Sequence, residues 1–340
     1  MSKQWDVAVL GATGLVGEML LTVLDERKFP VREIFPLASG RSLGKSVQFK
    51  GRAVRVIDAA GFDFGRAQLG LFSAGGEVSA EYAPKAAATG CVVIDNTSHF
   101  RYQPDIPLVV PEVNAAAIAQ YQARRIIANP NCSTIQMVVA LKPIYDAVGI
   151  ERINVATYQS VSGAGRKAVA ELADQTAQLL NGRPIEPRVL PRQIAFNCLP
   201  HIDKFMDNGY TREELKLHWE TRKIFGDETI RVNATAVRVP VFYGHSEAVH
   251  IETGRKISAV EARALLARAP GVQVLDEPIP GGYPTAVTEA ANHDTVYVGR
   301  IREDMTHERG LNLWVVGDNI RKGAATNAVQ IAEILVREYL

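Results

Sequence analysis

The sequence predicts an α/β protein that begins with a doubly wound parallel sheet and continues with an α+β domain. Apolar runs that alternate with stretches of helical spacing carry the first prediction, because this alternation is typical of βαβ units. A glycine-rich turn directly after the first apolar run supports it. Longer segments in which apolar and polar residues alternate, at 230–241 and 248–252, favour a mixed or antiparallel sheet in the second part.

The expected elements follow one another along the chain. Short apolar runs predict strands at 5–10, 34–38, 69–73, 91–95 and 311–317. Helical spacing and alanine-rich composition predict helices at 18–26, 79–89, 137–148 and 326–340. Thr211 and Glu214 form a capping-box pattern, so a further helix is expected from there to about Phe225, before Gly226. Right-handed crossovers then place the parallel strands in one sheet with helices on both faces.

The composition excludes several classes of protein. The 340 residues suffice for two domains with separate cores. The 38 Lys and Arg residues balance 37 Asp and Glu residues, which argues against a protein that coats nucleic acid or an anionic membrane. Three cysteines are too few for a disulfide framework, so a reducing compartment is expected. We find no signal peptide or bilayer-spanning segment, so we expect a cytoplasmic protein. We also expect no bound metal and no nucleic-acid or membrane partner.

The first turn, GATGLVG, indicates a nucleotide site. Glycines let the backbone approach a pyrophosphate, whose charge is favoured at a helix N-terminus. A tight turn without a ligand is the alternative reading. The position between an expected strand and an expected helix favours a nucleotide, although the spacing differs from the usual G-x-G-x-x-G. The residues expected to contact it are Gly11, Thr13, Gly14, Leu15 and Val16.

The loop after the second expected strand indicates which nucleotide binds. NAD sites usually carry an acidic residue there, whereas this loop offers Ser39, Arg41 and Ser42. An arginine with hydroxyl groups suits a 2′-phosphate, so we expect NADP rather than NAD; a basic surface loop is the alternative. Small residues suited to backbone contact with the cofactor end another expected strand: Ser73, Ala74 and Gly75.

Cys132 is a candidate nucleophile. It lies in the segment NPNCST just before an expected helix, where unpaired backbone N–H groups and the helix dipole favour a thiolate. A single cysteine more often serves packing, and we expect this of Cys91 and Cys198. The asparagine and hydroxyl residues around Cys132 favour catalysis instead.

Several motifs together resemble the aspartate-semialdehyde dehydrogenase family. They are GATGLVG, SAGG, DNTSHFR, NPNCSTIQ, YQSVSGAG, the Arg-x6-His pair and GDNIRKGAA, which span Val7 to Ala325. The resemblance implies the reduction of L-aspartyl-4-phosphate by NADPH to L-aspartate semialdehyde, phosphate and NADP, an early step towards lysine, threonine and methionine. A cysteine suits this reaction, because a thiolate can displace phosphate as a thioester that hydride then reduces.

The resemblance also implies roles for single residues. In the catalytic set, Cys132 is the nucleophile, His245 the acid–base catalyst and Gln159 the residue that orients the acyl group. The substrate-binding set comprises Arg238 for the carboxylate, Glu220 for the ammonium, and Lys223, Arg101 and Asn131 at the phosphate. From the residues alone, Glu220 and Lys223 could equally be a surface ion pair, and His245 a structural histidine.

Domain organisation follows from the same resemblance. Residues 1–130 and 322–340 are expected to form a discontinuous, Rossmann-type NADP-binding domain, because the last helix returns to it. Residues 131–321 are expected to form the catalytic domain, with a mixed sheet and a homodimer interface. Ser162 and Gly163 are expected near the active site and the cofactor, and Asn319 near the nicotinamide.

Two alternatives to this function stay open. N-acetyl-γ-glutamyl-phosphate reductases perform the same chemistry with overlapping motifs. A free ammonium needs a carboxylate partner, however, so Glu220 and Lys223 together with Arg238 favour the aspartyl substrate. A non-catalytic NADP-binding homologue would be expected to lack the cysteine or the histidine, and both are present.

Overall fold

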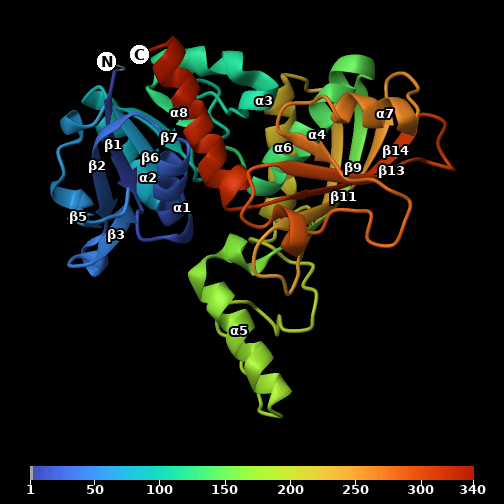
Figure 1. The fold of residues 1–340 in the computed structure, drawn as a ribbon, viewed down its shortest axis with the longest axis horizontal. Helices are drawn as coiled ribbons and strands as arrows, with labels where there is room; N and C mark the ends of the chain where they lie inside the picture. The colour runs from blue at the N-terminus through green and yellow to red at the C-terminus, as the bar shows by residue number, and fades with distance from the viewer. Residues whose placement is uncertain (1–2) are drawn as a thin grey trace. The chain divides into compact units, whose positions relative to one another are not determined.

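The computed structural model describes residues 3–340, apart from the side chain of Arg41. The chain divides into two units, drawn in Figure 1. The first comprises Met1–Asn131 and Ala324–Leu340, and the second Cys132–Gly323. The expected divisions were after residues 130 and 321, and those in the structure follow Asn131 and Gly323.

The first unit contains a six-stranded parallel sheet in the order β5-β2-β1-β6-β7-β8. Its strands are β1 (Trp5–Leu10), β2 (Val31–Ala38), β5 (Ile57–Asp58), β6 (Leu69–Phe72), β7 (Val92–Asp95) and β8 (Ile126–Ala128). An antiparallel hairpin is formed by β3 (Ser46–Phe49) and β4 (Arg52–Arg55). The helices are α1 (Leu15–Glu26), α2 (Gly76–Ala88), α3 (Pro111–Asn114) and α8 (Thr326–Glu338), with 3₁₀ turns η1 (Gly40–Ser42), η2 (Ala59–Gly61), η3 (Phe64–Arg66) and η4 (Ala115–Ala123).

Apolar burial explains why this unit is discontinuous in sequence. Every residue of β1 is buried, as expected for a strand covered on both faces. The C-terminal helix α8 packs beside α1, and Ala328, Val329 and Leu335 share one apolar core with Leu20. The last helix therefore completes the core of the N-terminal unit.

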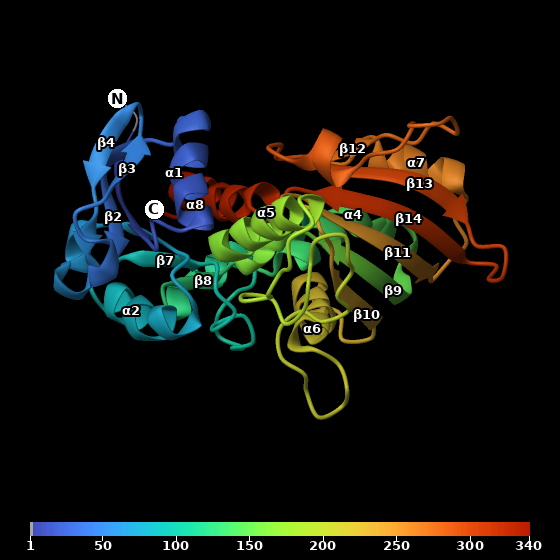
Figure 2. The same ribbon diagram turned by 90° about the horizontal axis from the view of Figure 1, so that it is seen from below.

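The second unit contains a six-stranded mixed sheet in the order β10-β9-β11-β14-β13-β12, which Figure 2 shows in sequence across the sheet. Its strands are β9 (Ile150–Gln159), β10 (Arg231–Arg238), β11 (His245–Thr253), β12 (Val272–Val274), β13 (Val296–Glu303) and β14 (Gly310–Gly317). The β9–β10 and β12–β13 pairs are parallel, and the other pairs are antiparallel. The helices are α4 (Cys132–Val148), α5 (Arg166–Leu180), α6 (Arg212–Phe225) and α7 (Ala259–Leu266), with the 3₁₀ turn η5 (Val161–Ala164) and π-helical turns η6 (Ala286–Ala290) and η7 (Arg321–Ala325). The predicted fold class, a doubly wound domain followed by a domain with a mixed sheet, is confirmed.

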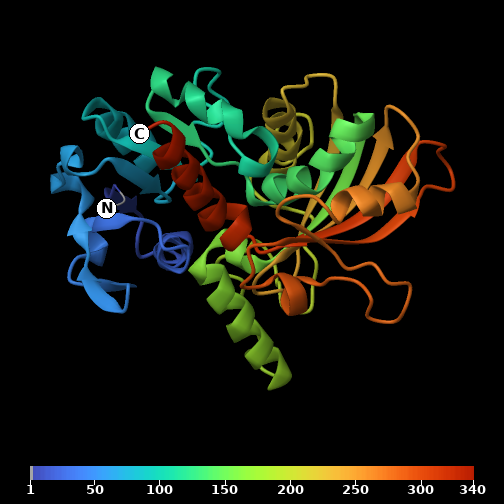
Figure 3. The same cartoon turned by 45° about the horizontal axis from the view of Figure 1, so that its top comes forward.

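One face of the mixed sheet is covered by helices. Helix α4 packs on β11, β14 and β9 and contacts α6 and α7 on its two sides (Figure 1). Helix α5 instead projects from the rest of the second unit, as Figures 1 and 3 show. Along β9 the buried side chains alternate with more exposed ones, so the strand presents one face to α4 and the other away from it.

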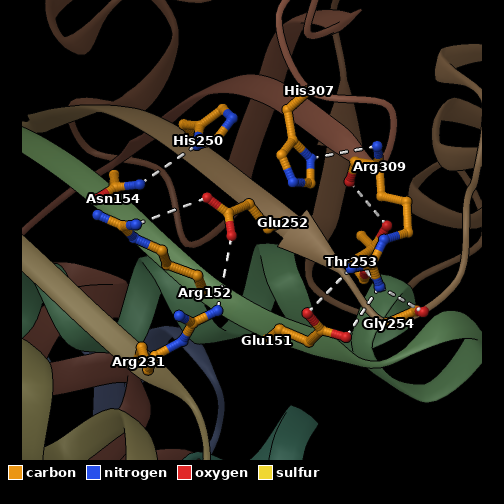
Figure 4. A network of polar contacts seen from close by, with 10 residues as sticks. All are labelled: Glu151, Arg152, Asn154, Arg231, His250, Glu252, Thr253, Gly254, His307 and Arg309. Atoms are coloured by element: carbon orange, nitrogen blue, oxygen red, sulfur yellow. Dashed lines mark hydrogen bonds and ion pairs between the residues drawn. The ribbon is translucent and has the colours of Figure 1, made fainter.

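The face of the sheet opposite α4 carries polar contacts (Figure 4). The carboxylate of Glu252 on β11 lies 3.9 Å from the guanidinium of Arg152 and 3.7 Å from that of Arg231. Farther along the strand, Asn154 lies 3.5 Å from Nδ1 of His250, whose Nε2 lies 2.8 Å from a carboxylate oxygen of Asp304. These contacts join the neighbouring strands β10, β9 and β11 to the loop that follows β13.

Arg309 lies in the loop between β13 and β14, at the end of the same strands (Figure 4). Its guanidinium donates to a carboxylate oxygen of Glu151 at 2.9 Å and to the carbonyls of Thr253 and Gly254 at 2.9 and 2.8 Å. The loop between β13 and β14 is thereby tied to β9 and β11.

Candidate active site

Cys132 is the first residue of α4 and is partly exposed. A thiol there faces unpaired backbone N–H groups, which favour its thiolate form. The backbone of Gly323 packs against it, since a Cβ atom at residue 323 would lie 2.8 Å from the Cβ of Cys132. Cys91 is 1% exposed, and burial raises the pKa of its thiol to about 12. Cys198 is exposed and lies in an irregular segment, so Cys132 alone combines access with a helix N-terminus.

The strand order brings three predicted residues to one edge of the mixed sheet. Gln159 ends β9 and is paired in register with Arg238, which ends the parallel strand β10. His245 begins β11, which runs antiparallel to β9 and therefore starts at the edge where β9 ends. Because the buried residues of these strands face α4, all three side chains point to the helix that begins with Cys132.

The ring of His245 is fully buried and held through Nδ1. That nitrogen accepts a hydrogen bond from the backbone N–H of Ser160 at 3.0 Å, so in the neutral ring the proton resides on Nε2. Among the described residues, Nε2 has no hydrogen-bond partner. Burial and, to a smaller extent, the charge of Arg238 lower the pKa of His245 to about 3, while Glu213 opposes the shift. His245 is therefore a neutral hydrogen-bond donor in the ligand-free site.

Gly163 packs closely against His245 and Arg238. A Cβ atom on this glycine would lie 3.0 Å from Nη1 of Arg238 and 3.4 Å from Nε2 of His245. The guanidinium of Arg238 is buried and donates to the carbonyl of Ser160 at 2.8 Å. Burial lowers the pKa of Arg238, while the nearby Glu213 and Cys132 favour its charged form. The predicted nucleophile, base and carboxylate-binding residue thus belong to one electrostatic group.

Asn319 lies at the centre of the network that supports His245. Its Oδ1 accepts hydrogen bonds from the Ser160 hydroxyl and the Gly244 N–H, both at 3.0 Å. Its Nδ2 donates to the Ser162 hydroxyl at 3.0 Å, and Ser160 in turn contacts the histidine ring. The structure therefore connects Asn319 and Ser162 to His245.

The acidic and basic side chains of α6 that lie near Gln159 are Glu213 and Lys216, whereas Glu220 and Lys223 were predicted. Nε2 of Gln159 donates to Oε1 of Glu213 at 3.2 Å, and Nζ of Lys216 donates to Oε2 of Glu213 at 2.8 Å. Lys216 also bonds Asp203 at 2.8 Å. Burial acts to lower the pKa of Lys216, but Glu213 and Asp203 outweigh it and leave the pKa raised. The lysine is therefore a cation at neutral pH.

The predicted Glu220 and Lys223 lie farther along α6 than Glu213 and Lys216. Helix α6 runs antiparallel to β10: Glu214 in its first turn accepts from the N–H of Ala236, and Arg222 near its end donates to the carbonyl of Ile230. The end of α6 therefore lies beside the start of β10, away from Arg238. Glu220 and Lys223 are two turns beyond the pair that contacts Gln159, about 10 Å along the helix axis.

A repeated pattern makes the two pairs equivalent in the sequence. Helix α6 contains the spacing Glu-x-x-Lys twice, at Glu213–Lys216 and again seven residues later. Residues seven apart face the same side of a helix, so periodicity cannot choose between the two pairs. The capping box is the signal that could have found the first pair, because it places Glu213 in the first turn, where the helix meets the end of β10.

In the first unit, a pocket of about 800 Å³ lies at the carboxyl edge of the parallel sheet. Its walls include most of the predicted cofactor contacts: Gly11, Thr13, Gly14, Ser39, Ser42, Ser73 and Ala74. Leu15 and Val16 begin α1 and Gly75 precedes α2, and these three do not line the pocket. The side chain of Arg41 lies outside the part of the chain that the structure describes.

The pocket has the form that a dinucleotide requires. Gly11 has a φ of +87°, and a Cβ atom there would lie 2.9 Å from the backbone nitrogen of Ala74. The hydroxyls of Thr13 and Ser42 lie 3.2 Å apart and join the first turn to the loop after β2. Lys45 also lines the pocket, as does Asp58, which was not predicted because it belongs to a strand of only two residues. The Asp58 carboxylate accepts the N–H of Ala60 at 3.2 Å.

Arg101 and Asn131 are buried in the first unit. The loop that carries Arg101 begins at Asp95, whose carboxylate accepts the hydroxyls of Ser79 and Thr97 at 2.7 Å each. The Arg101 guanidinium donates to the carbonyl of Asn96 at 2.8 Å. Asn131 directly precedes Cys132 in the chain.

Within residues 3–340, no cluster of three or more His, Cys, Asp or Glu side chains is arranged to hold a metal ion. No helix in that range is both long and apolar enough to cross a membrane.

Comparisons with known proteins agree with this architecture. Residues 6–121 match the semialdehyde dehydrogenase NAD-binding domain, and residues 141–322 match the semialdehyde dehydrogenase dimerisation domain. The aspartate-semialdehyde dehydrogenase of Legionella pneumophila is 66% identical over 340 residues, which cover 100% of this chain and 98% of that protein. Aspartate-semialdehyde dehydrogenase 2 of Vibrio cholerae is 62% identical over 339 residues, covering 100% of both.

Solved structures are similar over the same length. Aspartate semialdehyde dehydrogenase II of Vibrio cholerae, complexed with ASA, has a TM-score of 0.98 at 62% identity, with 100% of both chains covered. Aspartate semialdehyde dehydrogenase of Candida albicans with NADP has a TM-score of 0.75 at 25% identity, with 98% of both chains covered. The comparisons do not favour the N-acetyl-γ-glutamyl-phosphate reductase alternative. The resemblance read from the motifs is confirmed: the chain belongs to the aspartate-semialdehyde dehydrogenase family of oxidoreductases, with an NAD(P)-binding domain and a dimerisation domain.

Proposed function

We propose that the protein reduces L-aspartyl-4-phosphate with NADPH to L-aspartate semialdehyde, phosphate and NADP, and that it catalyses the reverse reaction as well. The observation that carries this proposal is the grouping of Gln159, Arg238 and His245 at the sheet edge that faces the start of α4, where Cys132 lies. That grouping provides a nucleophile, a proton carrier and a cation for one small acidic substrate.

Cys132 attacks the acyl carbon of the substrate. The thiolate forms a carbon–sulfur bond and phosphate leaves with the electrons of the carbon–oxygen bond, which produces a thioester. NADPH, when bound, supplies the hydride for the reduction. Gln159 orients the acyl group from the end of β9.

His245 moves the proton that the reaction requires. Collapse of the Cys132 thiohemiacetal to the aldehyde requires loss of the hydroxyl proton and return of the thiolate. Nε2 of His245 lies beside Gly163 and close to Arg238. To take the hydroxyl proton there, the ring first moves its own proton to Nδ1, which gives up the hydrogen bond from the Ser160 N–H. An anion bound beside the ring favours its protonated form, so substrate raises the low pKa that burial imposes.

Arg238 binds the substrate carboxylate, and Glu213 takes the role predicted for Glu220. A guanidinium fork can hold a carboxylate with two parallel hydrogen bonds. The carboxylate of Glu213, already bonded to Gln159, is the partner for the substrate ammonium. We assign Lys216 to phosphate in place of Lys223, together with the predicted Arg101 and Asn131.

NADP occupies the pocket of the first unit. Ser39, Ser42 and Lys45 line it near the end of β2, where an adenosine 2′-phosphate would need hydrogen-bond donors and a cation. Arg41 remains the predicted further cation of that loop. Ser162, Gly163 and Asn319 remain the predicted cofactor contacts of the second unit.

The protein acts as a homodimer, and we place the interface on the face of the mixed sheet opposite α4. The match to a dimerisation domain over residues 141–322 supports this proposal. On that face, Tyr158 is 36% exposed, and its ring centroid lies 5.6 Å from that of Trp314. Three free cysteines and a required thiolate favour the cytoplasm as its location.

Phosphate-dependent reduction of NADP by L-aspartate semialdehyde, followed at the nicotinamide absorbance, tests the function. We expect turnover with this substrate and NADP, and its loss in Cys132→Ala with NADP binding retained. Turnover with N-acetylglutamate semialdehyde alone would refute the substrate, and turnover with NAD alone would refute the cofactor. Cys198→Ser serves as the control, because it removes an exposed thiol outside the group.

A further inference from the structure

Glu247 carries a completely buried carboxyl group that no step above uses. It lies on β11 two residues after His245, so both side chains point to the same face of the sheet, under α4. Its neighbours across the sheet are Thr157 on β9 and Val315 on β14, which are also buried. A carboxyl group in this position calls for an explanation, because neighbours across the sheet offer it no opposite charge.

The groups that border this carboxyl come from the first turns of α4. They are Gln136 and Ser133, the residue after Cys132, and both act to lower the pKa of Glu247. Even so, neither carboxyl oxygen of Glu247 has a hydrogen-bond partner among the described residues, and neither has Oε1 of Gln136. With Glu247 ionised, these oxygens would all be acceptors.

Gln136 is held in place from two further sides. Its Nε2 donates to the backbone carbonyl of His245 at 3.5 Å. Its Oε1 packs on Gly317, since a Cβ atom there would lie only 2.9 Å away. Gln136 therefore links α4 to the start of β11 and to the end of β14, with Glu247 beside it.

The surroundings favour the neutral acid. Burial raises the pKa of Glu247 well above its ordinary value, and Gln136 and Ser133 oppose this only in part. The side chains that face it from α4 and from both neighbouring strands are uncharged. A protonated carboxyl has an O–H donor, which is what the Gln136 oxygen lacks. Protonation of Glu247 therefore adds a donor to a group of buried acceptors.

We propose that Glu247, as a neutral carboxylic acid, is a positioning residue that holds the helix start bearing Cys132 against the strand that begins with His245. The inference rests on the proposed roles of those two residues. Glu247 itself contacts no substrate. It acts on the reaction by fixing the distance and direction between the nucleophile and the proton carrier.

Two substitutions separate this role from a structural one. Glu247→Gln keeps the size and hydrogen-bonding capacity without an ionisable group, so kcat should stay within about threefold of the parent. Glu247→Met keeps the length but cannot hydrogen-bond, so kcat should fall about tenfold or more with little change in KM. Alkylation of Cys132 by iodoacetamide, measured against pH in a Cys198→Ser background, should shift in the Met variant only. A carboxylic acid infrared band should be present in the parent and absent from Glu247→Gln.

The outcomes are distinct. A loss of about tenfold or more in Glu247→Gln would show that an ionised carboxylate is needed and would overturn the proposal, as would an unchanged kcat in a folded Glu247→Met. If Glu247→Met does not fold, Gln136→Met provides the matching apolar test, and an unchanged kcat there has the same consequence. If the parent shows no turnover, the proposed function fails, whereas the alkylation profile of Cys132 still tests the positioning.

Discussion

Replacing Gly323 by alanine tests how closely the nucleophile is packed. In the structure, an added Cβ atom would lie 2.8 Å from the Cβ of Cys132 and 3.3 Å from its Cα and from the carbonyl oxygen of Asp318. Carbon atoms in good contact are separated by about 3.5–4.0 Å, so the new methyl overlaps Cys132 by about 0.7 Å or more. Backbone lies on both sides, and therefore Cys132 or the turn η7 must move.

The expected effect is kinetic more than thermodynamic. Overpacking of this kind costs about 1–3 kcal/mol of unfolding free energy. A displacement near 1 Å at a reacting atom reduces the rate by up to about 100-fold. We therefore expect kcat for NADP reduction by L-aspartate semialdehyde to fall about 10- to 100-fold in Gly323→Ala, with NADP affinity unchanged.

The measurement combines steady-state kinetics with thermal unfolding. Gly61→Ala is the matched control, because an added Cβ at Gly61 meets no atom within 4 Å, and its backbone φ is not positive. It should leave kcat and the melting temperature close to those of the parent. A folded Gly323→Ala with the parent kcat would refute the reasoning that this glycine sets the position of Cys132.

Three further predictions concern charge. Glu213→Gln should raise KM for the semialdehyde at least about tenfold, whereas Glu220→Gln should leave KM nearly unchanged; steady-state kinetics with the reverse result would restore the original assignment. Arg238→Lys should raise KM and lower kcat, because an ammonium cannot reproduce the bidentate fork, and unchanged kinetics would show that another group holds the carboxylate. Burial acts to raise the pKa of Glu171, but the backbone N–H groups of residues 188–190 outweigh burial and leave this pKa lowered. The contribution of Glu171 to stability is therefore complete above the pKa of the unfolded state, and it is lost as the pH falls through the lower pKa of the folded state. Unfolding free energy measured from neutral pH to below the folded pKa of Glu171 should therefore fall less in Glu171→Gln than in the parent, and parallel curves would contradict this.

Local sequence patterns predicted several of the strands and helices correctly. The expected strand 5–10 is β1, and the capping box at Thr211 and Glu214 forms, with the helix ending before Gly226 in the left-handed conformation. These features depend on residues close in sequence, whose propensities and hydrogen bonds act before any tertiary contact. Helix α1 begins at Leu15, three residues before the expected start, because its first turn belongs to the glycine motif itself.

Many contacts of the site join residues that are far apart in the sequence, so local patterns could not predict them. The E-x-x-K spacing occurs twice on one face of α6, and only the packing of this helix along β10 distinguishes Glu213 from Glu220. Asp58 lines the nucleotide pocket because β5 pairs with β2, and no local sequence pattern predicts this pairing. The low pKa of His245 and its Nε2 proton depend on burial and on one backbone N–H from another strand end.

The sequence by itself determined the order of strands and helices, the glycine turn and the family to which the chain belongs, because motifs and periodicities are local properties of the chain. Tertiary structure alone decided which acid contacts Gln159 and which lysine pairs with that acid, and that the carboxyl of Glu247 is buried beneath α4. The physical reason is that protonation, burial and ion pairing depend on groups brought together from distant segments. Those contacts exist only once the sheet has formed.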